Sequence, residues 1–129
     1  EQVRRVLRAW YLQQARVRFA DRLARQQRHA PWARDRDLDL RLRRMTRTWG
    51  TCNRHGLIRL NTHLVKAPLR CLDYVICHEL CHLEEMNHGP AFYALQEALW
   101  PAWRETRESG TSAIPRRAWT TPRKPSRST

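Results

Sequence analysis

Hydrophobic and polar positions divide the chain into a helical beginning, a short alternating stretch and a second helical region. Residues 1–29 contain neither Gly nor Pro and are rich in Ala, Leu, Gln and Arg. Apolar residues recur there at helical spacing: Val3, Val6, Leu7, Trp10, Leu12, Ala15, Phe19 and Leu23. The pattern predicts one long amphipathic helix, or two with a bend, with arginines on the solvated face and with Trp10 and Phe19 in the core.

Two short strands are predicted next. Residues 37–43 alternate strictly between charged residues and leucines, which predicts a half-buried strand with Leu38, Leu40 and Leu42 facing the core. Residues 57–60 suit a second strand, and the turn-forming residues between 49 and 56 suit a hairpin connection. We therefore expect a small antiparallel sheet.

Helical patterns return after the strands. Asn61 and Thr62 can cap a short helical turn through Val65, and Pro68 suits the first turn of a helix over about 68–86. The predicted buried stripe of that helix is Leu72, Val75, Ile76, Leu80 and Leu83. A third helix is expected over about 90–100, interrupted by Pro101, with Trp103 continuing the packing. The predicted fold class is therefore α+β, with a small sheet packed on a central helix.

The central helix carries the candidate chemistry, because residues 78–82 read His-Glu-Leu-Cys-His. His78 and His82 stand at i and i+4, so both rings project from one helix face and suit a single tetrahedral zinc ion. Glu79 lies beside the first histidine, where its carboxylate can reach a metal-activated water without binding the metal. The competing interpretation, an accidental match, is weakened by the apolar helical context and by a third histidine.

That third histidine, His88, can join the site only if the helix stops first. A continued helix would rotate it roughly 240° from His82, at about 100° per residue. Asn87 tolerates a left-handed conformation that could end the helix, and Gly89 and Pro90 can open the next one. We therefore predict His78, His82 and His88 as ligands of one zinc ion, with Glu97 as the alternative third ligand.

The predicted reaction is amide hydrolysis with Glu79 as general base, because three neutral imidazoles leave a fourth zinc position open for water. A second donor should stabilise the oxyanion, and a carboxylate should orient one ligand ring. The candidate oxyanion donors are Tyr74, Tyr93, His63 and Arg59. The candidate orienting carboxylates are Glu84, Glu85 and Glu97.

Length and composition limit the domain organisation. A chain of 129 residues suits one domain, expected over 1–110 with a helical part at 1–30 and a metal-binding core at 37–109. Residues 111–129 contain five basic and no acidic residues among Pro, Ser and Thr, which predicts a disordered tail. No run of 18 apolar residues exists, so we expect no transmembrane helix and no membrane partner.

The net charge of +13 is unevenly distributed. Residues 1–56 carry 15 basic and 5 acidic side chains, whereas residues 57–110 carry 5 basic and 7 acidic ones. Basic flanks around a mildly acidic centre can attract phosphates, so nucleic acid is a candidate partner. The alternative is a general bias toward arginine, since the basic residues are 23 Arg and 2 Lys. The sequence does not indicate an oligomeric state.

None of the four cysteines forms a Cys-x-x-Cys pair. Cys77 and Cys81 each precede a histidine and should face away from the ligands. Cys71 lies on the same helix face as His78 but about 10 Å away along the axis, too far to be a ligand. Free buried thiols indicate a reducing cytoplasm.

A longer series of residues, from about 45 to 103, resembles the YgjP-like family of zinc metallopeptidases, which is related to SprT-like proteases. The series includes Trp-Gly-Thr-Cys at 49–52, Gly-Leu-Ile-Arg-Leu-Asn at 56–61, His-Glu-Leu-Cys-His at 78–82 and Asn-His-Gly-Pro at 87–90. It departs from the family where Thr48 replaces the Arg before Trp and where Thr51 replaces Ser. The resemblance implies a zincin-like domain, His78, His82 and His88 as ligands, Glu79 as the catalytic carboxylate, and a peptide or protein substrate.

Three other functions remain open at this stage. The SprT-like branch includes proteases that act on proteins attached to DNA, which gives the basic flanks a possible role in targeting. A non-catalytic zinc-stabilised interaction module would use the same three histidines. An esterase or other hydrolase could use the same activated water.

Overall fold

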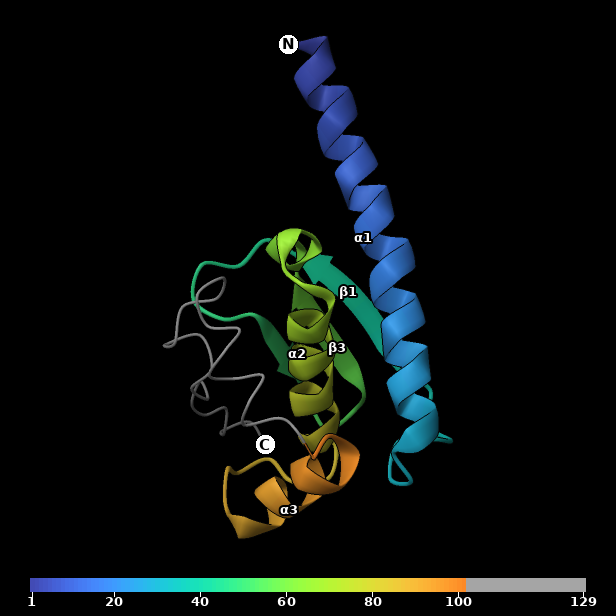
Figure 1. Ribbon diagram of the computed structural model, residues 1–129, viewed down its shortest axis with the longest axis vertical. Coiled ribbons are helices and arrows are strands. Elements are labelled where there is room, and N and C mark those ends of the chain that lie inside the picture. Colours follow the sequence, from blue (N-terminus) through green and yellow to red (C-terminus); the bar gives the residue numbers. More distant parts are fainter. Residues whose placement is uncertain (102–129) are drawn as a thin grey trace.

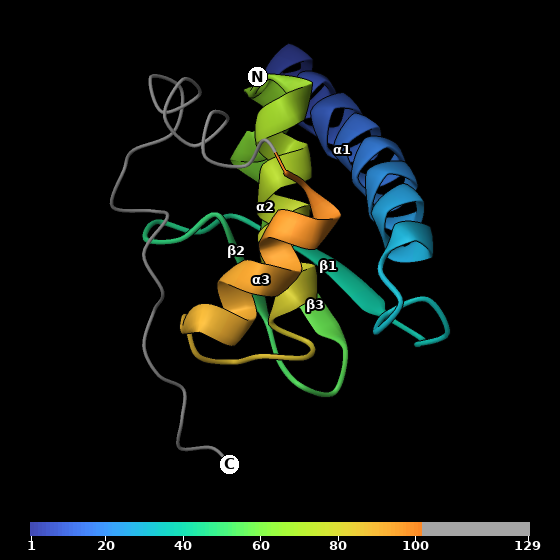
Figure 2. The same cartoon turned by 60° about the horizontal axis from the view of Figure 1, so that its bottom comes forward.

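The computed structural model describes residues 1–101, so the predicted tail at 111–129 and the predicted packing of Trp103 lie outside the described residues. Its elements, in chain order, are α1 (Gln2–His29), β1 (Asp39–Arg43), β2 (Gly50–Cys52), β3 (Leu57–Asn61), the 3-10 helix η1 (Thr62–Lys66), α2 (Leu69–Cys81) and α3 (Pro90–Leu99). Helix α2 lies at the centre, with the sheet on one side and α1 on another (Figure 1). Figure 2 shows α3 lying across the end of α2. The α+β prediction is confirmed.

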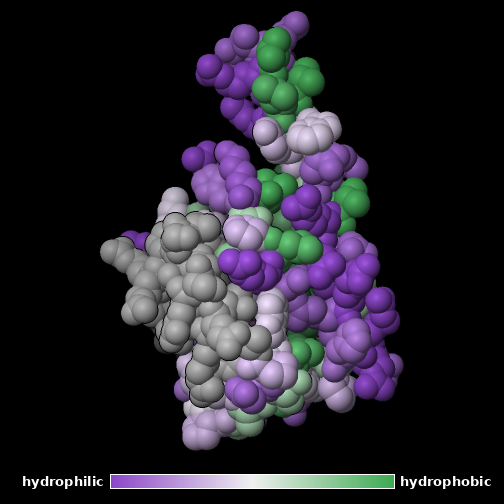
Figure 3. Space-filling view, in the orientation of Figure 1, coloured by the Kyte–Doolittle hydropathy of each residue, from purple (hydrophilic) through white to green (hydrophobic). Residues whose placement is uncertain are grey.

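Helix α1 is a single helix, but only its second half packs on the body of the molecule. Ala15, Phe19 and Leu23 are buried, as predicted. Trp10 was also predicted to lie in the core. This prediction is wrong, because Trp10 is 54% exposed. The first turns of α1 extend beyond α2 and the sheet, so their apolar side chains lie at the surface (Figures 1 and 3). Besides Trp10, the strongly exposed large apolar residues of α1 are Val3, Val6, Leu7, Tyr11 and Val17.

Polar contacts fix α1 against α2 beside this apolar interface. Arg22 donates from Nε and Nη2 to the two carboxylate oxygens of Asp73, at 2.9 and 2.8 Å. Gln26 donates to the backbone carbonyl of Asp73 at 2.6 Å. A bidentate arginine–carboxylate pair is geometrically specific, so it sets the register between the two helices.

The sheet is mixed, and its strand pairing differs from the predicted antiparallel arrangement. The strand order is β1-β3-β2, with β1 parallel to β3 and β2 antiparallel to it. The predicted pairing was wrong because the connection between β1 and β3 contains a strand of its own, Gly50–Cys52. That strand forms the hairpin with β3, through a turn in which Gly56 has a φ of +95° that favours glycine. Leu38, Leu40 and Leu42 pack against the core cluster as predicted.

Asn61 fixes the loop that precedes β2. Its side chain accepts from the amide of His63, which caps η1 as predicted, and donates to the carbonyls of Met45 and Thr48 at 2.9 and 3.0 Å. The residue is only 2% exposed, so water cannot replace these bonds. Asn61 thereby ties the 45–48 loop to the start of the helical region.

We expect Asn61→Ala to destabilise the protein by about 1–3 kcal/mol, because it leaves the part-buried carbonyl groups of Met45 and Thr48 without their donor. Urea unfolding would measure the change. Asn53→Ala is a matched control, since the Asn53 side chain also bonds to the backbone, by accepting two hydrogen bonds, but is exposed, in the β2–β3 turn. Equal losses in the two variants would contradict the special role of Asn61.

Helix α2 is buried on almost all sides. Ten of its residues are buried: Cys71, Leu72, Tyr74, Val75, Ile76, Cys77, His78, Glu79, Leu80 and Cys81. The indole of Trp32, in the turn after α1, donates to the carbonyl of Leu80 at 2.7 Å and so satisfies the last turn of the helix. Within residues 1–101, no helix has the length and apolar character needed to cross a bilayer.

Candidate metal centre

Three histidine side chains meet at the C-terminal end of α2. His78 lies in the last turn, His82 is the C-cap residue, and His88 lies in the loop before α3. One ring nitrogen from each lies within 4.8 Å of the others. The Nε2 atoms of His82 and His88 are 3.0 Å apart.

The chain reaches this arrangement by ending α2 earlier than predicted. The helix stops at Cys81 rather than near residue 86, and the amides of His82, Leu83 and Glu84 each bond to a carbonyl three residues back. These i→i−3 hydrogen bonds are of the 3-10 type and end the α-helix at this point. The chain can then turn, so that His88 reaches the side on which His78 and His82 lie. The predicted left-handed Asn87 was wrong, because the only positive φ within residues 1–101 belongs to Gly56. Gly89 and Pro90 open α3 as predicted.

Hydrogen bonds set the orientation of two of the rings. The Nδ1 of His78 lies 3.2 Å from Oε1 of Gln96, and the Nδ1 of His82 lies 3.1 Å from the carbonyl oxygen of Glu85. Each acceptor favours a proton on Nδ1, which leaves Nε2 with its lone pair. Both rings therefore carry the tautomer that binds metal through Nε2.

The donor set fits a divalent metal such as zinc. Zinc–nitrogen distances of about 2.0–2.1 Å in a tetrahedron place two ligand nitrogens about 3.3 Å apart, and the Nε2 atoms of His82 and His88 are 3.0 Å apart. Burial, followed by the nearby His88, lowers the pKa of His82 to about 4, so its ring is neutral at pH 7. A neutral imidazole is the form that binds a metal.

An aromatic side chain from α3 lies against all three histidines. The ring of Phe92 is completely buried, and its centroid lies 5.0 Å from His78, 4.7 Å from His82 and 4.5 Å from His88. Such packing restricts the rotamers of the rings before any metal binds, so less conformational entropy is lost on binding.

Glu79 lies one residue after the first histidine and is only 6% exposed. Edge strand β2 covers it at Gly50, where a Cβ atom would lie 3.2 Å from both Cγ and Oε2 of Glu79. Glycine is therefore what permits this close approach. Burial raises the pKa of Glu79 to about 8.

We expect the metal-free protein to lose stability between pH 6.5 and 8. Folded Glu79 keeps its proton up to a pKa of about 8, whereas the unfolded chain releases it near the ordinary value of 4.5. The folded state then binds more protons, so stability falls as pH rises, by about 1.4 kcal/mol per unit. His82 contributes only below its ordinary pKa of 6.5, where stability falls as pH falls. Urea unfolding in a chelator should show the decline, and Glu79→Gln should abolish it; an unchanged slope in the variant would contradict this assignment.

The other predicted site residues divide into two tyrosines whose rings lie near a histidine ring and three residues that lie outside the three-histidine cluster. The ring centroid of Tyr74 lies 6.1 Å from that of His78, and Tyr93 lies 6.0 Å from His88. His63 lies in η1 and Arg59 in β3, and neither belongs to the histidine cluster. Glu97 is exposed and also lies outside the cluster.

The hydrogen bonds to Nδ1 of His78 and His82 come from a side-chain amide and a backbone carbonyl rather than from the predicted carboxylates. Glu85 contributes its backbone carbonyl rather than its side chain, and Gln96, the neighbour of Glu97, contributes an amide. Sequence reasoning missed Gln96. The available signal was its position four residues after Phe92, within the apolar stripe of α3. A polar side chain is unfavourable there unless it makes a specific hydrogen bond.

The cysteines are free, and three of them are buried. Cys77 and Cys81 pack against Phe92, next to the site but outside the histidine cluster. A hydrogen bond with Cys81, followed by burial, raises the pKa of Cys77 far above its ordinary value, so this thiol stays protonated at neutral pH.

Comparisons with known proteins identify the family and agree with the fold. The sequence profile described as "YgjP-like, metallopeptidase domain" matches residues 1–109. The fold is similar to that of the metallopeptidase zymogen abylysin from Pyrococcus abyssi, with a TM-score of 0.65, 19% identity and coverage of 74% of this chain and 94% of that one. It is also similar to the zymogen of jannalysin from Methanocaldococcus jannaschii, with a TM-score of 0.54, 20% identity and coverage of 61% and 78%. No curated protein matches.

Proposed function

Because the chain belongs to the YgjP-like metallopeptidase family, we propose that it cleaves peptide bonds with one zinc ion bound by His78, His82 and His88 and with Glu79 as general base. The observation that carries the proposal is the convergence of three histidine nitrogens at the end of α2, where the residue that follows the first histidine is a buried glutamate. A structural zinc site usually closes with four protein ligands, whereas three leave a position for reaction.

Zinc fits this donor set and the metallopeptidase family of the chain. Three imidazoles suit zinc better than calcium or magnesium, which prefer oxygen ligands. A bound zinc ion would supply Lewis acidity, which activates water and polarises a carbonyl group.

Glu79 has the position and environment of a proton carrier. Its carboxylate can accept the proton of the attacking water and deliver it to the leaving amine. Burial raises its pKa to about 8 in the metal-free protein, and a nearby cation lowers a carboxyl pKa. A bound metal would therefore lower this pKa from about 8, toward the range in which a carboxylate releases its proton at neutral pH and can act as a base.

Strand β2 provides a surface for an extended peptide. It forms one edge of the sheet, and Gly50 places it directly against Glu79. A peptide can add to an exposed strand edge through main-chain hydrogen bonds, with little demand on its sequence. We propose that the substrate binds along β2, with the scissile bond near Glu79.

The test is elemental analysis of protein purified without chelators, combined with digestion of a mixed peptide library. We expect one zinc ion per chain and cleavage that stops when a chelator removes the metal and returns when zinc is added. Bound zinc without cleavage would refute the peptidase proposal but leave the metal site. Protein that takes up no zinc would refute both.

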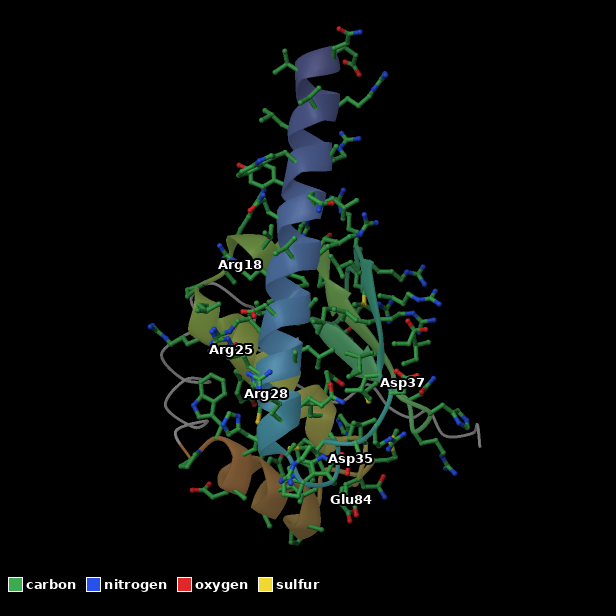
Figure 4. All side chains as sticks on the ribbon, turned by 90° about the vertical axis from the view of Figure 1, so that its right-hand side faces the viewer. Arg18, Arg25, Arg28, Asp35, Asp37 and Glu84 are labelled. Carbon is green, nitrogen blue, oxygen red and sulfur yellow. The ribbon has the colours of Figure 1, made fainter. Side chains whose placement is uncertain are left out.

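A second proposal is that basic surfaces bring the enzyme to nucleic acid. Arg18, Arg25 and Arg28 point outward from α1 (Figure 4). On the sheet, Arg41 and Arg59 stand directly opposite each other in the parallel register, and Arg41 also donates two hydrogen bonds to the exposed carboxylate of Asp39. Binding to duplex DNA should then weaken steeply with salt, with a smaller slope in Arg18→Gln/Arg25→Gln. Absence of binding at low salt would refute it.

We also propose a cytoplasmic location. All four cysteines lie within residues 1–101 and are free, which suits a reducing compartment. Localisation of a tagged full-length protein would test this.

A further inference from the structure

Gln96 is a fully buried amide at the metal centre. It lies on α3, one turn after Phe92, with 0% of the residue exposed. Its Oε1 atom lies 3.2 Å from Nδ1 of His78. Its Nε2 atom is buried and has no hydrogen-bond partner among the described residues.

We propose that Gln96 is a positioning residue, which selects the metal-binding tautomer of His78 and couples α3 to the metal centre. The inference rests on the proposed zinc site, and it concerns a contact from α3 rather than the ligands themselves.

A neutral imidazole carries a single ring proton, on either Nδ1 or Nε2. When Oε1 of Gln96 accepts from Nδ1–H, the proton is fixed on Nδ1 and the lone pair of Nε2 is free for a metal. The reversed amide would donate to Nδ1 and force the proton onto Nε2, which could not then bind. Metal binding through Nε2 therefore requires the orientation in which Oε1, and not Nε2, of Gln96 faces His78.

Packing alone does not account for an amide at this position. A buried N–H without a partner is unfavourable, and an apolar side chain of similar volume would avoid that cost. Phe92, on the same face of α3, shows that the surroundings accept apolar atoms. The amide is thus a less stable choice for the metal-free fold and a better one for orienting His78.

The decisive variant is Gln96→Met, which keeps the volume and removes the acceptor. We expect the zinc Kd, measured by competition with a chromophoric chelator, to rise about 10- to 100-fold, as for other partners that orient metal ligands. The urea midpoint of the metal-free protein should stay the same or rise. The visible spectrum of the Co²⁺-loaded protein should change, because the ring of His78 is no longer held.

Gln96→Glu supplies the rescue, since a carboxylate at this position can only accept when ionised. We expect its zinc Kd to equal or fall below that of the wild type, while the metal-free protein loses stability from a buried acid. Leu95→Met is the control on the same helix, and its zinc Kd should not change.

In Gln96→Met, a weaker zinc affinity without a loss of stability would show that Gln96 positions His78 and does not support the fold. A wild-type zinc Kd in Gln96→Met would overturn this inference and leave the proposed function intact. A parallel loss of stability and affinity in Gln96→Met would show that the residue supports the fold, and would also overturn it. If the wild-type protein binds no zinc, the proposed function fails first and this inference fails with it.

Discussion

Glu79→Gln is expected to bind zinc as the wild type does and to lose about 10²–10⁴-fold in kcat. The amide nearly matches the carboxylate in shape, so the close contact with Gly50 can be preserved. It cannot accept the proton of the attacking water, and general base catalysis typically contributes a factor of this size. Steady-state hydrolysis of a fluorogenic peptide, together with elemental analysis of the same samples, measures both quantities.

A matched control removes a carboxylate charge elsewhere. Asp35 is exposed in the turn after α1 (Figure 4), so Asp35→Asn should leave kcat and zinc content unchanged. Wild-type turnover in Glu79→Gln would show that another group moves the proton. Loss of zinc in that variant would show that Glu79 supports the metal centre instead.

His88→Ala should have the second large effect, a loss of zinc and of all metal-dependent hydrolysis. Partners that merely orient a ligand are worth about 10–100-fold in affinity, so removal of a ligand should raise Kd by more than about 100-fold. The metal-free protein should remain folded, because His88 is only half-buried and lies in a loop. Chelator competition and circular dichroism would establish these two points separately.

His55→Ala is the corresponding control, since His55 is an exposed histidine in the β2–β3 turn. Its zinc content should equal that of the wild type. If His88→Ala retains zinc at wild-type affinity, His88 is not a ligand and Glu97 returns as a candidate.

The local part of the site was predictable because its geometry follows from short spacings. His78 and His82 share a helix face at i and i+4, and the position of His88 demanded a helix end that Gly89 and Pro90 made plausible. The exact turn was not predictable, because the tight bonds after Cys81 depend on where the buried part of α2 ends. Asn87 has a propensity for the left-handed conformation, but it does not adopt that conformation in the structure.

Non-local features were harder to predict. Strand β2 has three residues, Gly50–Cys52, which is too short for an alternating pattern, so the parallel pairing of β1 and β3 was missed. The contact between Gln96 and His78 joins residues on different helices, and helical periodicity carries no information about such a pair. Trp10 is an example of a contact that was predicted but is absent from the described residues. An apolar stripe along a helix does not show whether another element packs against it.

The nearness of the three histidines in the chain has a consequence for thermodynamic linkage. All of them lie within residues 78–88, so the loops between them are short and their closure in a denatured chain loses little entropy. Zinc can therefore also bind the denatured ensemble, which reduces the stabilisation that its native affinity would otherwise give. When the chain refolds without chaperones in the presence of zinc, the three histidines would already be bound to the ion at the start. The contact between Arg22 of α1 and Asp73, which are far apart in the sequence, would form later.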